Sequence, residues 1–165
     1  RGGMVYSKNQ KAAAHLSRQV QDGKLEKIYQ AVVCGKPVDN VGKYVDYLLK
    51  DEKENTSRIV DMGIKGGKRA ELICRVLESK TVEPYGELTL AEIELLTGRH
   101  HQIRVQMAHA GMPLLGDQRY GSEESREVST QLGIRTIRLQ AVKLAFCHPT
   151  SGKRVCYELT DKLTL

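Results

Sequence analysis

The spacing of apolar positions along the chain predicts both helices and strands. Residues 10–24 ("QKAAAHLSRQVQDGK") open with three alanines, place apolar residues four positions apart and stop at Asp-Gly, which is typical of a helix with a glycine at its end. Residues 26–37 ("EKIYQAVVCGKP") are rich in β-branched and aromatic residues and end on Gly and Pro, so they predict a strand. Within this strand Tyr29 and Ala31 share one face, because successive side chains alternate.

The rest of the chain carries further strand patterns without a regular alternation of strands and helices. Residues 42–69 are charged and contain several glycines, which indicates a surface loop or short strands. Strands are predicted at residues 70–79, 88–96, 136–147 and 153–159, and a turn with Pro and Gly joins the last two into a hairpin. This order favours an α+β fold with a mixed, mainly antiparallel sheet flanked by helices and loops over a doubly wound parallel sheet.

Length and composition narrow the class of protein. A chain of 165 residues with 40% hydrophobic and 28% charged residues is sufficient for one globular domain, which we expect to span residues 1–165. Apolar runs stay short of the roughly 20 residues that cross a bilayer, and the first residues lack the pattern of a secretory signal, so we expect a cytoplasmic protein with no membrane partner. The four cysteines form no Cys-x-x-Cys pair, and each is expected to be a buried free thiol.

One short stretch concentrates cationic chemistry. In residues 95–117 ("LLTGRHHQIRVQMAHAGMPLLGD"), Arg99, His100 and His101 precede apolar residues at helical spacing, so they lie at the N-terminus of a predicted helix that ends near Gly111. A helix N-terminus favours an anion, and the net charge of +6 favours a polyanion such as nucleic acid. Arg104 lies one turn inside the helix, where a guanidinium that points inward needs a carboxylate or a ligand.

The same residues do not support a metal site or a nucleophilic catalytic site. His100 and His101 are neighbours whose side chains are expected to diverge, and His109 lies eight residues beyond His101, too far to share an ion. We therefore predict no metal. A nucleophile on a Gly-x-Ser-x-Gly turn is also absent from the sequence. The residues alone indicate an anion site with nucleic acid as its partner.

Residues 95–121 ("LLTGRHHQIRVQMAHAGMPLLGDQRYG") resemble the signature of the RluA family of pseudouridine synthases. The usual form of that signature is Thr-Gly-Arg-x-His-Gln-(Ile/Leu)-Arg-Val-His, followed by Gly-x-Pro, two apolar residues, Gly-Asp and a Tyr. Residues 4–16, 17–35 and 139–153 resemble other segments of the family, so the similarity covers nearly the whole chain. The resemblance implies the pseudouridine synthase catalytic fold, incomplete at its N-terminus.

The resemblance also implies an activity: isomerisation of uridine to pseudouridine in rRNA or tRNA by a monomer, with no metal or organic cofactor. The nucleophile is an aspartate in a His-Arg-(apolar)-Asp-Arg motif, which we expect about four residues upstream of Arg1. By the match, Tyr29 packs on the target nucleobase and acts as a general base late in the reaction. Arg104, by the same match, pairs with the aspartate. The alternative is a catalytically inactive RNA-binding module with the same fold.

The remaining residues of the cationic stretch have two interpretations. These residues are Arg99, His100, His101 and Gln102. They either hold phosphates of the substrate or cap the helix and order the loop. Three positions depart from the family pattern, none of them an expected catalytic position. They are His100 where Thr or Ser is usual, Gln106 where His is usual, and Gln140 in place of a His.

Overall fold

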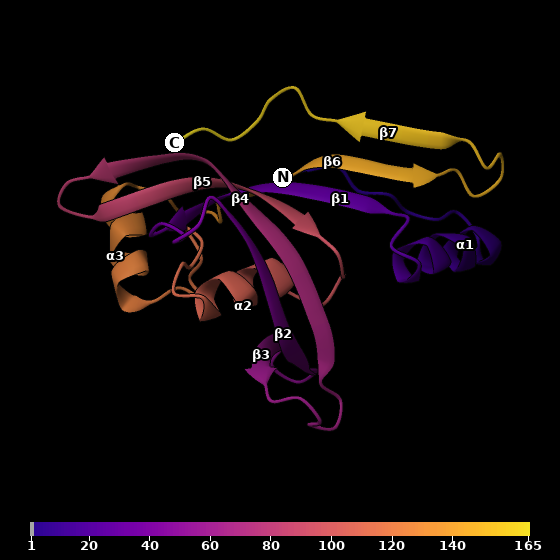
Figure 1. Ribbon diagram of the computed structural model, residues 1–165, viewed down its shortest axis with the longest axis horizontal. Coiled ribbons are helices and arrows are strands. Elements are labelled where there is room, and N and C mark those ends of the chain that lie inside the picture. The colour runs from indigo at the N-terminus through magenta and orange to yellow at the C-terminus, as the bar shows by residue number, and fades with distance from the viewer. Residues whose placement is uncertain (1) are drawn as a thin grey trace.

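The computed structural model describes residues 2–165 and places seven strands in one sheet (Figure 1). The strands are β1 (Glu26–Cys34), β2 (Val41–Asp51), β3 (Thr56–Val60), β4 (Lys68–Val82), β5 (Gly86–Leu95), β6 (Leu139–Cys147) and β7 (Arg154–Glu158). Their order in the sheet is β3-β2-β4-β5-β1-β6-β7, and each neighbouring pair is antiparallel. A single parallel bridge joins Gly2 to Ala141. The predicted α+β class with a mainly antiparallel sheet is confirmed.

The helices lie on one side of the sheet in Figure 1, and the chain after β7 runs along the other. Helix α1 (Gln10–Gln21) and α2 (Gln102–His109) match the two predicted helices. Ile103 and Met107 of α2 pack against buried residues of β1, β4 and β5, which are Ala31, Val33, Leu72, Cys74, Ala91 and Ile93. Tyr29 is partly buried at the edge of this cluster, on the face it shares with Ala31.

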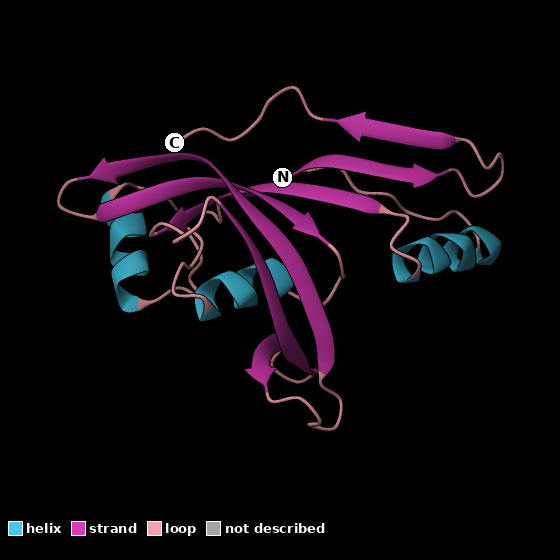
Figure 2. Cartoon of the chain, in the orientation of Figure 1, coloured by secondary structure: helices cyan, strands magenta, loops and turns pink. Residues whose placement is uncertain are grey.

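The prediction for residues 42–69 is wrong in one respect. The segment contains an 11-residue strand, β2, followed by β3, rather than a loop or short strands. Exposed residues at positions 41, 43 and 45 alternate along β2 with partly buried residues at positions 42, 44 and 46, since one face of an antiparallel strand is open to solvent. The outer end of β2, β3 and the start of β4, residues 47–69, project beyond the rest of the sheet (Figure 2). We call these residues the arm.

A small apolar cluster fixes the arm against α2. Leu48 and Ala70 are buried against Val105 of α2, with Ile59 and Tyr120 packed around them. Burying an apolar side chain of this size contributes about 1.5–3 kcal/mol, so the arm has a defined position relative to the helix.

Helix α3 (Glu123–Gln131) was not predicted, because its sequence offers only one apolar residue, Val128. Its local signals lie at the first turn. Ser122 accepts a hydrogen bond through its side chain from the Ser125 N–H, and two glutamates follow Ser122, where they complement the helix dipole. The capping pattern, rather than periodicity, marks this helix in the sequence.

The cysteines are free thiols, as predicted, but they are not all buried. Cys74 is buried and Cys156 is exposed, because Cys156 lies on the edge strand β7. None of the helices between residues 2 and 165 is long and apolar enough to cross a membrane.

Candidate active site

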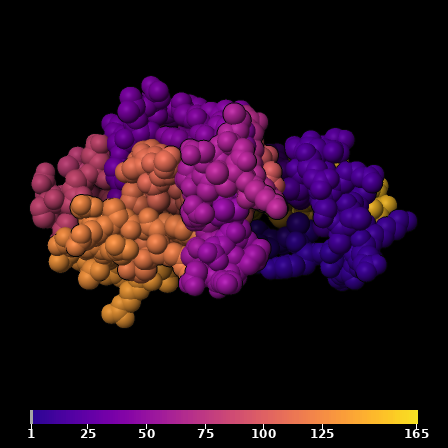
Figure 3. Space-filling model, turned by 90° about the horizontal axis from the view of Figure 1, so that it is seen from below, coloured from indigo at the N-terminus to yellow at the C-terminus, as the bar shows by residue number. Residues whose placement is uncertain are grey.

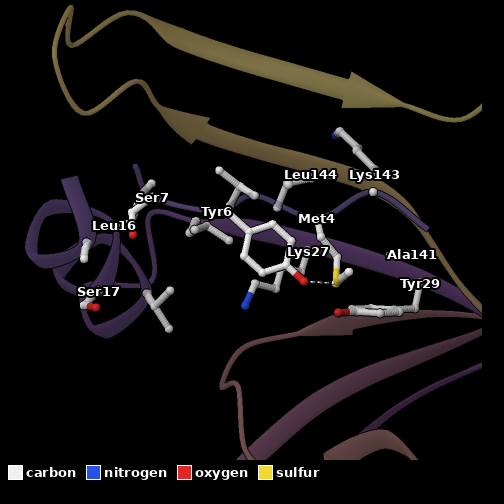
Figure 4. Close-up of a pocket in the computed structure, with 15 residues that line it drawn as sticks. Met4, Tyr6, Ser7, Leu16, Ser17, Lys27, Tyr29, Ala141, Lys143 and Leu144 are labelled. Carbon is white, nitrogen blue, oxygen red and sulfur yellow. Dashed lines mark hydrogen bonds between the residues drawn. The ribbon is translucent and has the colours of Figure 1, made fainter. Parts of the chain in front are cut away.

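Tyr29 projects from β1 into a pocket of about 370 Å³, which we call the Tyr29 pocket. Its walls are residues 3–7, one side of α1, and parts of β1 and β6. Figure 4 shows Tyr29 and Lys27 extending from the same strand, with Tyr6 across from them. The volume falls in the range of sites that bind small molecules, about 300–1,000 Å³.

An irregularity of the sheet lies beside Tyr29. Ile28 pairs with Lys143 of β6 while Tyr29 pairs with Ala141, so Val142 is an extra residue on β6. A β-bulge of this kind increases the local twist and changes the direction of nearby side chains. Gly2 forms a parallel bridge with Ala141 of β6 at the same place, where a Cβ would lie 2.5 Å from the Ala141 nitrogen, so only glycine permits this close approach.

The environment of Tyr29 suits contact with a base. Partial burial raises the pKa of the Tyr29 hydroxyl above its ordinary value, so the phenol is protonated at neutral pH. Within residues 2–165 that hydroxyl makes no hydrogen bond to a protein group, whereas its ring packs beside the core under α2. A flat ring with an unused polar tip can stack on a nucleobase and exchange a proton with it.

Arg104 has a carboxylate partner inside the chain, which the sequence analysis did not identify. Its Nε and Nη2 donate to Oδ2 and Oδ1 of Asp117, each at 2.7 Å, in a two-pronged ion pair. The Asp117 side chain is 1% exposed and that of Arg104 is 16% exposed. Asp117 therefore satisfies the buried guanidinium, and a role of Arg104 beside the family aspartate stays a prediction.

The turn before Asp117 fixes its carboxylate. Gly116 has a φ of 81°, and a Cβ there would clash with the carbonyl oxygen of Thr136. Asp117 Oδ1 also accepts hydrogen bonds from the backbone N–H groups of Arg119 and Tyr120. Burial raises the pKa of Asp117, but the hydrogen bonds and the Arg104 charge outweigh that effect and leave the pKa below its ordinary value.

His100 and His101 belong to a network that ties the arm to α2. The Tyr120 hydroxyl accepts from the Ser57 N–H at 2.9 Å and lies 2.9 Å from Nδ1 of His101, and Ser57 Oγ lies 3.0 Å from Nδ1 of His100. The two imidazole rings do not diverge as predicted, since their centroids are 3.8 Å apart. The reason is the left-handed conformation of His101, with a φ of 51°, which turns its side chain away from the helical direction.

We predict that His101 is neutral throughout the physiological pH range. Burial, followed by the charge of Arg104, lowers the pKa of His101 from 6.5 to about 4. As the pH falls, the unfolded chain takes up a proton at His101 at a higher pH than the folded protein does. The folded state therefore loses stability as the pH falls from about 6.5 towards 4. NMR titration of the imidazole resonances measures this pKa directly. A midpoint for His101 between pH 6 and 7 would contradict the prediction.

Gln102 orders the loop before α2. Its Oε1 accepts from the Arg99 N–H and the Thr97 hydroxyl, both at 2.9 Å, and its Nε2 donates to the carbonyl of Glu71. The side chain is buried, so it is closed to a large ligand. The Arg99 side chain, by contrast, is exposed, and Nε donates to the carbonyl of Arg69, which places the guanidinium against the arm.

A second hollow of about 390 Å³ lies between the arm and the loop at residues 98–100, and we call it the arm pocket. Four of its lining residues carry cationic or imidazole groups: Lys50, Lys68, Arg99 and His100. Figure 3 shows the molecule hollowed between the arm, in magenta, and the N-terminal residues and α1, in indigo. The arm and the loop after Gly98 line the arm pocket, whereas the N-terminal residues and α1 help to line the Tyr29 pocket.

The predicted site residues thus separate into three groups. Tyr29 lies in its own pocket, Arg99 and His100 line the arm pocket, and the other three, His101, Gln102 and Arg104, lie inside and support the loop and the arm. Sequence reasoning missed Lys27, although its position two residues before Tyr29 places both side chains on one strand face.

Comparison with known proteins points to one family. The family model described as RNA pseudouridylate synthase matches residues 1–109. Ribosomal large subunit pseudouridine synthase C of Vibrio cholerae is 34% identical over 93% of this chain, and an uncharacterized RNA pseudouridine synthase of Aquifex aeolicus is 36% identical over 99% of it. These alignments cover 46% and 50% of the two relatives, so the chain spans about half their length.

Solved structures agree with this similarity. Human RNA Pseudouridylate Synthase Domain Containing 1 superposes with a TM-score of 0.72 at 25% identity, covering 93% of this chain and 62% of that structure. Human RNA Pseudouridylate Synthase Domain Containing 4 has a TM-score of 0.68 at 18% identity, which supports the fold alone; it covers 92% of this chain and 64% of that structure.

Proposed function

Because this chain belongs to the RNA pseudouridylate synthase family, we propose that it forms the catalytic part of an enzyme that converts uridine to pseudouridine in RNA. The observation that carries the proposal is the Tyr29 pocket, in which the tyrosine of the family's strand motif faces a cavity beside a cationic loop. An enzyme that acts on a glycosidic bond must take the nucleotide out of its stack, and the cavity offers the extruded uracil a place beside an aromatic ring.

We assign the steps as follows. An aspartate, in a motif that residues 1–165 do not contain, attacks the sugar carbon of the target nucleoside and displaces uracil through its N1. Carbon 5 of the freed uracil then attacks the same sugar carbon and displaces the aspartate, so the ring is joined to the sugar through carbon 5. The proton on carbon 5 must then leave. Tyr29 lies against the uracil, and its oxygen accepts that proton as its own proton passes, through water at the open side of the pocket, to N1 of the uracil, which no longer holds the sugar.

Ribosomal RNA is the substrate class that we propose. The relatives from Vibrio cholerae and Zymomonas mobilis carry the name ribosomal large subunit pseudouridine synthase, which favours rRNA over tRNA. A cytoplasmic location is part of the same proposal. The exposed cations of the arm pocket, Arg99 and Lys68, are suited to a phosphate backbone.

The test of this function uses the full gene product and a transcript of large-subunit rRNA with tritium at carbon 5 of uridine. Pseudouridine formation releases that tritium, so we expect release in proportion to the pseudouridine found in the digested RNA. Binding of the transcript without release of tritium would contradict the proposed activity and favour the alternative, a catalytically inactive RNA-binding module.

Arg99 gives a separate prediction about RNA binding. We expect Arg99→Gln to weaken RNA binding. The plot of the logarithm of the association constant against the logarithm of the salt concentration should become shallower by about 0.7–0.9, since one phosphate contact is lost. Fluorescence anisotropy across a salt series measures this slope. The matched control is Arg135→Gln, because Arg135 is exposed and lines neither pocket. Equal slopes for the two variants would show that Arg99 only orders the loop.

A further inference from the structure

Lys27 is a partly buried cation that the proposed reaction does not use. It lines the Tyr29 pocket together with apolar side chains, among them Leu16 and Val20 of α1. Within residues 2–165 it has no ion pair or hydrogen bond through its ammonium group, and no carboxylate lines the pocket. Burial accordingly lowers the pKa of Lys27. A buried charge without a partner is unfavourable, so an anion that enters this pocket gains a favourable contact.

The second lysine of the pocket differs in this respect. Lys143 donates to Glu26 at 2.6 Å, and the same carboxylate also binds Arg154. The charge of Lys143 is therefore offset by a neighbour outside the pocket. Of the two lysines, only Lys27 presents an uncompensated charge to a ligand beside Tyr29.

Lys27 also lies where the two pockets meet. Gly98 lines the arm pocket, and a methyl group added to Gly98 would lie 3.7 Å from the Lys27 ammonium. The next residue along the loop is Arg99, whose guanidinium donates to the carbonyl of Arg69 at the edge of the arm. Cations therefore continue from the arm pocket, past Gly98, to the mouth of the Tyr29 pocket, and a chain of phosphates is a polyanion that can follow them.

We propose that Lys27 binds a backbone phosphate of the RNA next to the nucleotide that enters the Tyr29 pocket. The inference rests on the proposed function for the identity of the ligand as RNA. Lys27 acts as a binding and positioning residue: it holds the phosphate while the base turns towards Tyr29. Because Lys27 lines the Tyr29 pocket, the contact forms when the strand lies against that pocket, and it favours the extruded state of the nucleotide over the stacked state.

The test measures RNA binding and RNA modification separately in the full gene product. The binding probe is a fluorescein-labelled oligouridine. For Lys27→Gln we expect a loss of affinity of roughly tenfold and a salt slope smaller by about 0.7, the value for one phosphate contact on a single strand. Lys27→Arg keeps the charge and should restore most of the slope.

The control variant is Lys143→Gln, at a lysine of the same pocket whose charge is already offset by Glu26, and its salt slope should equal that of the parent. Circular dichroism establishes that each variant is folded. An unchanged slope in Lys27→Gln, with slower tritium release only, would overturn the proposal and assign Lys27 to the chemical step. If the parent binds oligouridine yet releases no tritium from rRNA, the proposed reaction fails while the phosphate contact is still tested by the slopes.

Discussion

The Tyr29→Phe variant of the full gene product is expected to release tritium from carbon-5-labelled RNA about 10²–10⁴-fold more slowly than the parent, the usual contribution of a positioned acid or base. The change removes one oxygen and keeps the ring, so stacking on the base should persist. Since the Tyr29 hydroxyl makes no hydrogen bond within residues 2–165, the variant should be as stable as the parent. Single-turnover rates at saturating enzyme separate the chemical step from RNA binding.

Tyr157→Phe is the matched control, because Tyr157 lies on the edge strand β7 and is 61% exposed. Its rate should equal that of the parent. If Tyr29→Phe retained the parental rate while Tyr29→Ala abolished it, the ring alone would matter and the assigned proton transfer would be wrong.

The second large effect concerns stability. We expect Asp117→Asn to lower the free energy of unfolding by about 3–5 kcal/mol, because it leaves the guanidinium of Arg104 buried without its carboxylate. The guanidinium also lies 4.8 Å from the centroid of the Tyr120 ring, so its displacement should disturb the network that holds the arm. Urea denaturation followed by circular dichroism measures the change.

Arg75→Gln provides the comparison. Arg75 pairs with Glu94 at 3.0 Å, but both side chains are at least 30% exposed, so its loss should cost at most about 1 kcal/mol. A similar small cost for Asp117→Asn would show that the buried pair contributes no more than a surface pair and would contradict the role given to Asp117.

The same pair predicts an acid dependence. The pKa of Asp117 is lower in the folded protein than in the unfolded chain, so its contribution is complete above the unfolded value of about 3.9 and is lost as the pH falls through the folded value. The parent should therefore lose more stability than Asp117→Asn between about pH 5 and pH 2. If the free energy of unfolding fell equally with pH in the two proteins over this range, the pairing would be ruled out as the source of the acid sensitivity.

The sequence supported a correct prediction wherever local spacing determines structure. Helix α1 and β1 follow from apolar periodicity and a terminating glycine, and the helix after the cationic stretch begins at Gln102, where the spacing places it. The prediction for residues 42–69 was wrong because β2 is a half-exposed antiparallel strand in which charged residues and a glycine stand among the apolar ones, so its composition resembles that of a loop. Helix α3 was missed because it shows a capping serine but almost no apolar stripe.

For the candidate site, the sequence by itself determined the family resemblance, the face that Tyr29 occupies and the cationic character of the loop, since these depend on residue type and on spacing over a few positions. Only the tertiary structure decided which groups meet. The pairing of Arg104 with Asp117, the hydrogen bond between Ser57 and His100, and the position of Lys27 beside Gly98 all join residues distant in the chain. Such contacts depend on how the sheet twists and how α2 packs on it, and no local pattern encodes that geometry.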